Sequence, residues 1–172
     1  MNKGLEALWN FIEKIAHGIL SVLFHVAGRE LSEDTFAAFM QFVKFGIVGV
    51  SNTVVSYGIY VISLLAFKRM HLFVKYDYFI AQIAAFVLSV LWSFYWNNKM
   101  VFTVKEGQKR PVWKTLLKTY VSYSFTGLFL NSILLVLWVR VLGISEFIAP
   151  IANLVISVPI NFVINKFWAF RS

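Results

Sequence analysis

Four long runs of uncharged, mainly apolar residues constrain this chain more than any other feature. They cover residues 45–67, 78–98, 119–139 and 147–165, which are 23, 21, 21 and 19 residues long. At about 1.5 Å per residue, each run can cross a hydrocarbon core of roughly 30 Å as a helix. Lipid offers the backbone no hydrogen-bond partners, and the alternating strands of a barrel are not seen. The runs therefore predict an all-α integral membrane protein with four transmembrane helices.

The composition agrees with this fold class and excludes several others. Hydrophobic residues make up 59% of the 172 residues and charged residues 14%, whereas a soluble domain has roughly 45–50% and about 25%. The formal charge of +8 does not indicate nucleic-acid binding here, because basic loops orient membrane helices and contact anionic lipids. Cysteine is absent, which excludes disulfides and thiolate metal sites. We expect no metal, cofactor or nucleic acid.

Most lysine and arginine residues lie on one side of the predicted membrane. Twelve fall in the N-terminal arm, in the loop between the second and third runs, or in the tail. The other side has four, which are Lys68, Arg69, Lys75 and Arg140. Because cytoplasmic loops carry the excess of basic residues, this distribution predicts a multi-pass protein of the cell membrane with both termini in the cytoplasm.

Residues 1–40 form an arm that differs from the membrane domain predicted at 41–172. Apolar side chains recur at three-and-four spacing from Leu5 to Val26, and polar side chains fill the other face. This pattern is typical of an amphipathic helix, which we expect to lie in the interface of the inner leaflet. Ser32 precedes Glu33, Asp34 and Thr35, and it predicts the N-cap of the helix that leads into the first run.

The second and fourth runs are similar to each other at an offset of 68 residues, where 93–102 (SFYWNNKMVF) lies over 161–170 (NFVINKFWAF). The matching pairs are Phe94 and Phe162, Asn97 and Asn165, and Phe102 and Phe170. The first and third runs match more weakly at an offset of 78. Since each repeat contains two helices, both copies enter the membrane in the same direction, which predicts two parallel-repeat hairpins about an axis along the membrane normal.

Polar residues in these two runs recur every four positions and so share one helix face. They are Ser89, Ser93 and Asn97 in the second run, and Asn153, Ser157, Asn161 and Asn165 in the fourth. Two interpretations stay open. Serine and asparagine commonly hydrogen-bond between membrane helices, which would make both stripes structural. Alternatively, the asparagines converge with Lys99 and Lys166 at one depth to bind a polar ligand.

The pattern Asn-Phe-x-x-Asn-Lys-x-Trp-x-Phe at 161–170 resembles the signature that closes the last helix of the GtrA-like family. The weaker copy at 93–102 is similar to the family's second helix, and residues 42–49, followed by Thr53, are similar to the start of its first helix. The resemblance covers about residues 40–171 with four spans in order. The chain departs from the family pattern at Ser93, where asparagine is usual, and at Asn98, where a cation is usual.

This resemblance implies that the protein flips a polyprenyl-phosphate-linked monosaccharide from the inner to the outer leaflet, for glycosylation of a surface polysaccharide or teichoic acid. The implied partners are this lipid, the surrounding membrane lipids and the membrane glycosyltransferases that make and use it. A homo-oligomer could build the pathway, because four helices make a narrow bundle. The alternative is a non-transporting membrane anchor or accessory subunit of a polyprenyl-phosphate glycosyltransferase.

The expected substrate-binding residues lie at the cytoplasmic ends of the second and fourth runs. They are Ser93, Asn97, Asn98, Lys99, Asn161, Asn165, Lys166 and Trp168. Lysine ammonium groups can donate to a phosphate, amides can bond phosphate or sugar hydroxyls, and an indole can stack on a sugar ring. The competing interpretation is that the lysines snorkel to the headgroups and the tryptophan anchors its helix.

All eight acidic residues and all three histidines lie outside the four runs. A proton- or ion-coupled pump usually keeps an ionisable group at membrane depth. We therefore expect uncoupled transport, and an exporter of hydrophobic cations is disfavoured. No Gly-rich phosphate loop, metal-ligand cluster or paired intramembrane carboxylate is present in the sequence, so we expect no enzyme and no catalytic residue. Gly46, Gly49 and Gly58 favour close helix packing over ligand contact.

Overall fold

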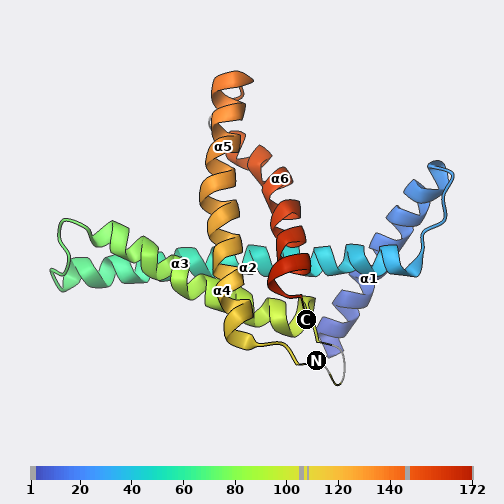
Figure 1. The fold of residues 1–172 in the computed structure, drawn as a ribbon, viewed down its shortest axis with the longest axis horizontal. Coiled ribbons are helices and arrows are strands. Elements are labelled where there is room, and N and C mark those ends of the chain that lie inside the picture. The colour runs from blue at the N-terminus through green and yellow to red at the C-terminus, as the bar shows by residue number, and fades with distance from the viewer. Residues whose placement is uncertain (1–2, 105–106, 108, 146–147, 172) are drawn as a thin grey trace. The chain divides into compact units, whose positions relative to one another are not determined.

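The computed structural model describes residues 3–104, 107, 109–145 and 148–171, and the regular elements within them are helical. Four helical segments are long and apolar enough to cross a membrane, as Figure 1 shows in their order along the chain. They are Glu33–Arg69, Asp77–Val101, Val112–Val141 and Ile151–Ala169. The predicted all-α fold with four spans is confirmed. Phe147, the predicted start of the fourth run, lies outside the described residues.

The chain divides into two compact units, Met1–Lys44 and Phe45–Ser172, and helix α2 (Glu33–Arg69) continues across the division. In the first unit, α1 (Lys3–Val26) packs against the start of α2. The rings of His17 and Phe36 meet edge to face at 5.0 Å. The Lys44 ammonium lies 5.0 Å from the centre of the Trp9 ring. These contacts make the first unit a helical hairpin.

The turn of this first hairpin is built from two capping motifs. The amide of Arg29 donates to Phe24 O at 2.9 Å and that of Gly28 to His25 O at 3.0 Å, which is the Schellman pattern. Gly28 takes the left-handed conformation at φ +69°, which glycine adopts without steric cost. The amide of Thr35 then donates to Ser32 Oγ at 3.2 Å, so the predicted N-cap at Ser32 is confirmed.

The α1 helix exposes a continuous apolar face within its unit. The exposed side chains are Phe11, Ile15, Ile19, Val22, Leu23 and Val26. All recur at helical spacing, as the sequence predicted. An amphipathic helix of this kind buries such a face in the headgroup region of a bilayer, and the interfacial position of α1 stays a prediction.

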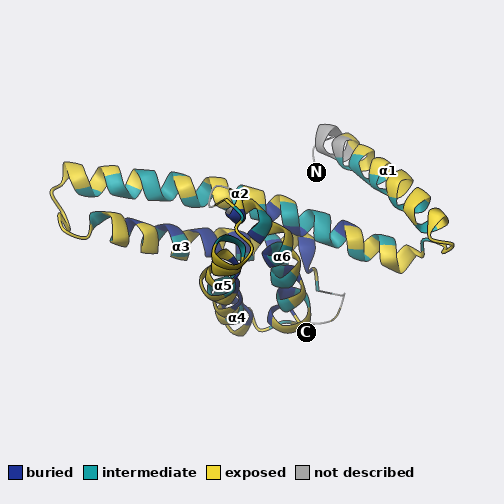
Figure 2. Ribbon diagram, turned by 90° about the horizontal axis from the view of Figure 1, so that it is seen from above, coloured by how far each residue is buried: buried dark blue, intermediate teal, exposed yellow. Residues whose placement is uncertain are grey.

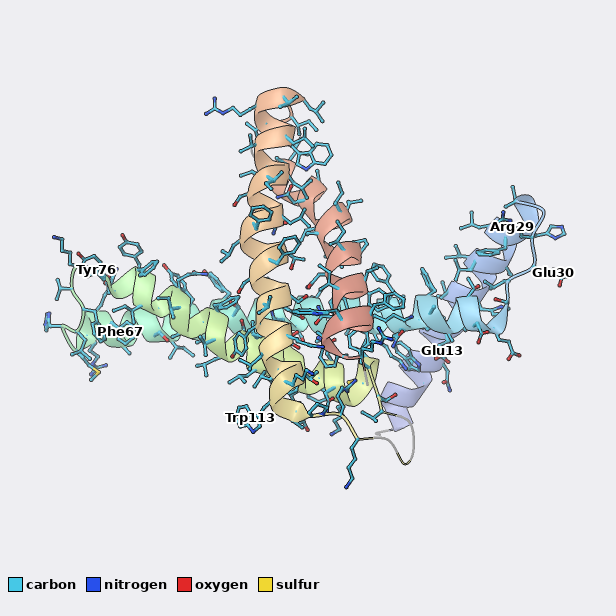
Figure 3. All side chains as sticks on the ribbon, viewed as in Figure 1. Glu13, Arg29, Glu30, Phe67, Tyr76 and Trp113 are labelled. Atoms are coloured by element: carbon cyan, nitrogen blue, oxygen red, sulfur yellow. The ribbon has the colours of Figure 1, made fainter. Side chains whose placement is uncertain are left out.

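The second unit contains two helical hairpins. The first joins α2, from Phe45 onward, to α3 (Asp77–Trp96), and α3 continues into the turn η1 (Asn97–Val101). Figure 3 shows Phe67 and Tyr76 at the closed end of this hairpin, where the rings of Phe67 and Phe73 meet at 5.3 Å.

The second hairpin starts with one long helical segment made of four consecutive elements. They are α4 (Val112–Ser124), η2 (Phe125–Leu130), α5 (Asn131–Val136) and η3 (Leu137–Val141). The return helix is α6 (Ala149–Ile164), which ends in η4 (Asn165–Ala169). Asn153 on α6 donates to the Asn131 carbonyl at 3.0 Å, which links the two arms of this hairpin.

The internal repeat is visible in the way α3 and α6 end. Each finishes in a five-residue π-helical turn that starts at the matching asparagine. The amide of Phe102 bonds Asn97 O at 2.7 Å, and that of Phe170 bonds Asn165 O at 2.8 Å. The elements η2 and η3 are also π-helical, so what distinguishes the ends of α3 and α6 is the buried asparagine at which each turn starts. The two copies thus share their local backbone geometry as well as their sequence.

Four phenylalanines relate the two copies by an approximate twofold axis. The Phe94 and Phe170 rings stack at 5.8 Å, and their exchanged counterparts Phe162 and Phe102 stack at 5.9 Å. The equivalent pair Phe102 and Phe170 stacks directly at 4.7 Å. In a twofold interface, residue i meets residue j and j meets i, so the axis passes through this last pair. These contacts support the predicted repeat of two hairpins, and the direction of its axis relative to the membrane stays a prediction.

Buried residues of the second unit gather where α3, α4 and α6 meet (Figure 2). The α2–α3 hairpin runs crosswise to α4–α5 and α6 in both ribbon views, and the two hairpins touch at the ends that carry η1 and η4.

The expectation that glycines of the first run allow close helix packing is wrong within this chain. A Cβ added at Gly46, Gly49 or Gly58 would meet no atom within 4 Å, so these glycines do not mediate close packing between its helices.

The apolar face of α1 is predicted to lie in the bilayer interface. In the cysteine-free chain, a fluorophore on Val22→Cys labels that face, and one on Asn10→Cys labels the polar face. In proteoliposomes we expect iodide to quench the Asn10→Cys label several-fold more strongly, because lipid shields Val22. Equal quenching of both labels would contradict an interfacial helix.

Candidate functional site

The candidate site lies around the π turns η1 and η4, where the matching residues Asn97 and Asn165 of the two repeats are inside the protein. Asn97 starts η1 and Asn165 starts η4, and each side chain is 0% exposed. Ser93, one turn before Asn97, is also fully buried. Because an unsatisfied amide is costly in an apolar interior, the partners of these groups decide how the helices pack.

The first asparagine joins α3 to α4. Asn97 Nδ2 donates to Ser93 Oγ at 3.1 Å and to the Tyr123 hydroxyl at 3.3 Å. The hydroxyls of Ser93 and Tyr123 also hydrogen-bond to each other. The three side chains form a closed triangle between two membrane helices, the arrangement that the structural interpretation of the polar stripe predicts.

The second asparagine joins α6 to the same part of α4. Asn165 Nδ2 donates to Ser122 Oγ at 3.0 Å, to Asn161 Oδ1 at 2.9 Å and to Asn161 O at 2.8 Å. Ser122 Oγ in turn donates to Asn161 Oδ1 at 3.0 Å. Ser122 and Tyr123 are consecutive, so a single turn of α4 holds the asparagines of both repeats.

The side-chain oxygens of Asn97 and Asn165 are further hydrogen-bond acceptors of the site. The Oδ1 atoms of Asn97 and Asn165 are buried and have no hydrogen-bond partner within the described part of the chain. They occupy equivalent positions in the two repeats. A donor that reached these oxygens would satisfy a group that is otherwise costly to bury.

The two lysines of the predicted site lie outside the asparagine clusters. Lys99 is exposed, donates to the Tyr95 hydroxyl at 3.4 Å and lies 5.6 Å from the Trp96 ring. Lys166 is half-buried, with its ammonium 5.4 Å from the Phe162 ring and 5.8 Å from the Phe167 ring. Both ammonium groups lie over aromatic faces, which attract cations, and the structure does not bring them among the amides.

Asn98 and Trp168 each meet a basic residue that the sequence analysis did not single out. Asn98 Oδ1 accepts a hydrogen bond from Arg110. The Trp168 carbonyl accepts one from Lys118 Nζ at 2.9 Å, and this ammonium lies 5.4 Å from the Trp168 ring. The Trp168 side chain itself is 42% exposed. The family pattern usually has a cation at position 98. The neutral Asn98 in this chain was the sequence feature that could have indicated a basic partner from another segment.

Arg110 stays charged in this position. Partial burial lowers the pKa of its guanidinium through desolvation, but a guanidinium does not lose its proton in proteins. The described residues contain no group of three or more His, Cys, Asp or Glu side chains able to hold a metal ion. The chemistry of this region therefore consists of cationic donors, amides, hydroxyls and aromatic rings.

Comparisons with known proteins place most of the second unit in a described family. The family profile described as GtrA/DPMS, transmembrane domain, matches residues 44–170. A dolichol-phosphate mannosyltransferase of Pyrococcus furiosus is 33% identical over 127 residues, which are 73% of this chain and 32% of that protein. The chain thus spans about a third of the length of this relative.

Two shorter relatives carry the name cell wall teichoic acid glycosylation protein GtcA. The Listeria monocytogenes protein is 28% identical over 113 residues, which are 64% of this chain and 75% of that protein. The Listeria innocua protein is 30% identical over 100 residues, which are 56% of this chain and 66% of that protein. The family match begins at residue 44, so α1 lies outside it.

The buried asparagines are predicted to stabilise the fold. Asn165→Ala removes the three hydrogen bonds that its amide donates, and Ser122 and Asn161 then keep only the bond between their side chains. We therefore expect a loss of about 1–3 kcal/mol in the free energy of unfolding. Ser132→Ala is the matched control, because this exposed hydroxyl bonds only the backbone of its own helix. Denaturation in mixed micelles measures both. A loss equal to that of Ser132→Ala would contradict the structural role.

Proposed function

This chain belongs to the family of the GtrA/DPMS transmembrane domain, and on that premise we propose that it flips a polyprenyl-phosphate-linked monosaccharide from the inner to the outer leaflet. The proposed product serves glycosylation of a cell-surface polysaccharide or teichoic acid, the process named for the GtcA relatives. The proposal assigns this multi-pass membrane protein no catalytic step.

The observation that carries the proposal is that both repeats end in the same arrangement. The turns η1 and η4 each start at a buried asparagine and contain a lysine that is not buried, Lys99 in one copy and Lys166 in the other. An ammonium at the headgroup level can donate charge-assisted hydrogen bonds to a phosphate. The exposed indole of Trp168 offers a face on which a sugar ring can stack.

We assign the predicted binding residues to two stages. Lys99 and Trp168 are exposed and Lys166 is half-buried, so these three would meet the headgroup first. Asn161 is also half-buried and would follow them. Ser93, Asn97 and Asn165 are fully buried, so they can contact cargo only after the contacts around them open. Asn98 is engaged by Arg110 and would act through that contact.

The energy source that fits this arrangement is the gradient of the lipid itself. The acidic residues lie outside the four predicted runs, so no carboxylate is available at membrane depth to carry a coupling proton. A pH gradient across proteoliposomes should therefore leave the transport rate unchanged.

A second candidate function rests on the mannosyltransferase relative. The matched region is 32% of that protein, so a domain similar to this chain forms part of a protein named as a glycosyltransferase. This supports the alternative of a membrane anchor or accessory subunit for a polyprenyl-phosphate glycosyltransferase.

Transport by the purified protein tests the choice between these functions. Liposomes that contain only this chain and a fluorescent polyprenyl-phosphate monosaccharide should move the lipid between leaflets. We expect Lys166→Ala to slow this about 10–100-fold, because a hydrogen bond to a charged group contributes about 1.5–3 kcal/mol. Lys114→Ala, which removes an exposed lysine in the first turn of α4, is the control and should keep the wild-type rate. Activity that requires an added transferase would favour the accessory subunit.

We also propose that both termini and the loop between α3 and α4 face the cytoplasm, from the distribution of basic residues. In intact cells, a membrane-impermeant maleimide should label Lys75→Cys in the loop between α2 and α3, but not Lys109→Cys. The reverse pattern would invert the proposed direction of transport.

A further inference from the structure

Arg110 connects the ends of the two repeats with a single side chain. Its Nη1 donates to the carbonyl of Phe170 at 2.7 Å, and its Nη2 donates to the carbonyl of Phe102 at 2.7 Å. Nη2 also donates to Asn98 Oδ1. The guanidinium carbon lies 4.9 Å from the centre of the Phe170 ring. One planar group thus binds a main-chain carbonyl of each copy and stacks on an aromatic ring.

The two carbonyls that Arg110 binds are equivalent in the repeat. Phe102 follows η1 and Phe170 follows η4, and their rings stack at 4.7 Å on the approximate twofold axis. Carbonyls at the end of a helix have no donor within the helix and carry partial negative charge. A cation close to the axis can therefore stabilise the ends of both repeats at once.

Asn98 explains why the repeat is broken at one position. The equivalent residue of the second copy is Lys166, and a lysine at 98 would place an ammonium beside the Arg110 guanidinium. Two cations at this distance repel each other, and the repulsion grows where burial reduces the screening by water. The neutral amide instead offers its Oδ1 as an acceptor. Asn98 and Arg110 are therefore a matched pair that leaves one cation at the junction.

We propose that Arg110 is a positioning residue that clasps the two hairpins together at their π-turn ends, and that a phosphate headgroup opens this clasp. The opening step rests on the proposed function. A hydrogen bond from a guanidinium to an ionised oxygen is roughly twice as strong as one to a neutral oxygen, so a phosphate competes with the two carbonyls for Arg110. Opening would allow the hairpins to part and would break the Asn97–Tyr123 hydrogen bond, which joins α3 to α4.

Moving the charge from one position to the other tests the clasp. Arg110→Gln leaves no cation at the junction, Asn98→Lys leaves two, and the double variant Asn98→Lys/Arg110→Gln leaves one. Thr103 and Arg171 are exposed and directly follow the clasped carbonyls. Since the chain has no cysteine, spin labels on Thr103→Cys and Arg171→Cys report the distance between the two ends by pulsed electron paramagnetic resonance.

In the labelled protein without further substitutions, we expect a short distance between the labels with a narrow distribution. Each single variant should lose this short distance. The double variant should recover it, because a lysine at 98 can donate to the same carbonyls. Lys109→Gln, which removes the exposed neighbouring cation, is the matched control and should leave the distance unchanged. An unchanged distance in both single variants, or a double variant no better than the worse single one, would overturn the clasp. Asn98→Lys keeps Arg110, so this comparison holds even if Arg110→Gln does not fold.

The opening step has its own test in the same labelled protein. Vesicles with polyprenyl monophosphate should broaden the distance distribution towards that of Arg110→Gln. Vesicles with an equal fraction of phosphatidylglycerol, or inorganic phosphate in solution, separate a specific lipid from a general effect of phosphate. An unchanged distribution with polyprenyl monophosphate would refute release by the headgroup. Absent transport together with a distance that responds as expected would refute only the proposed flipping.

Discussion

The hydrogen bonds that one turn of α4 makes to both repeats hold the second unit together. Tyr123 accepts a hydrogen bond from Asn97, and Ser122 accepts one from Asn165. Two consecutive residues of α4 thus bind asparagines at the ends of α3 and α6. In a bilayer, packing and hydrogen bonds associate helices, because lipid removes the hydrophobic driving force between them. Two asparagines without partners would each carry a desolvation cost of about 1–3 kcal/mol. This cost makes the position of α4 a condition for the rest of the structure.

The approximate twofold axis sets a second constraint on this arrangement. The stacked rings of Phe102 and Phe170 lie on the axis, but the residues that surround them do not obey it. Asn97 bonds a tyrosine and Asn165 bonds a serine. Arg110 bonds the Phe102 and Phe170 carbonyls of both copies, and no second cation among the described residues has a printed bond to these two carbonyls. A symmetric pair of cations there would repel each other, so the symmetry has to break where the copies meet.

The extent to which the sequence predicts this structure depends on the range of each interaction. The four spans, the N-cap at Ser32 and the repeat of Asn97 and Asn165 follow from local patterns of hydropathy and spacing, and the structure contains them. The hydrogen-bond partners of those asparagines do not follow from the sequence, because a polar stripe has the same spacing whether it packs against another helix or binds a ligand. In the sequence, Arg110 is one of several basic loop residues. Its role depends on carbonyls 8 and 60 residues away along the chain.

The buried amides and the more exposed ammonium groups lie in different places, and this affects how such a protein could bind a charged lipid. A fully open polar groove would admit water and ions along the same route. Here Asn97 and Asn165 are buried, whereas Lys99 remains exposed and Lys166 half-buried at the ends of the helices. The cations can therefore attract a phosphate without exposing the polar interior to the bilayer. In the proposed opening step, the amides reach a ligand only when the contacts that bury them are exchanged, which would couple binding and opening through the same hydrogen-bonding groups.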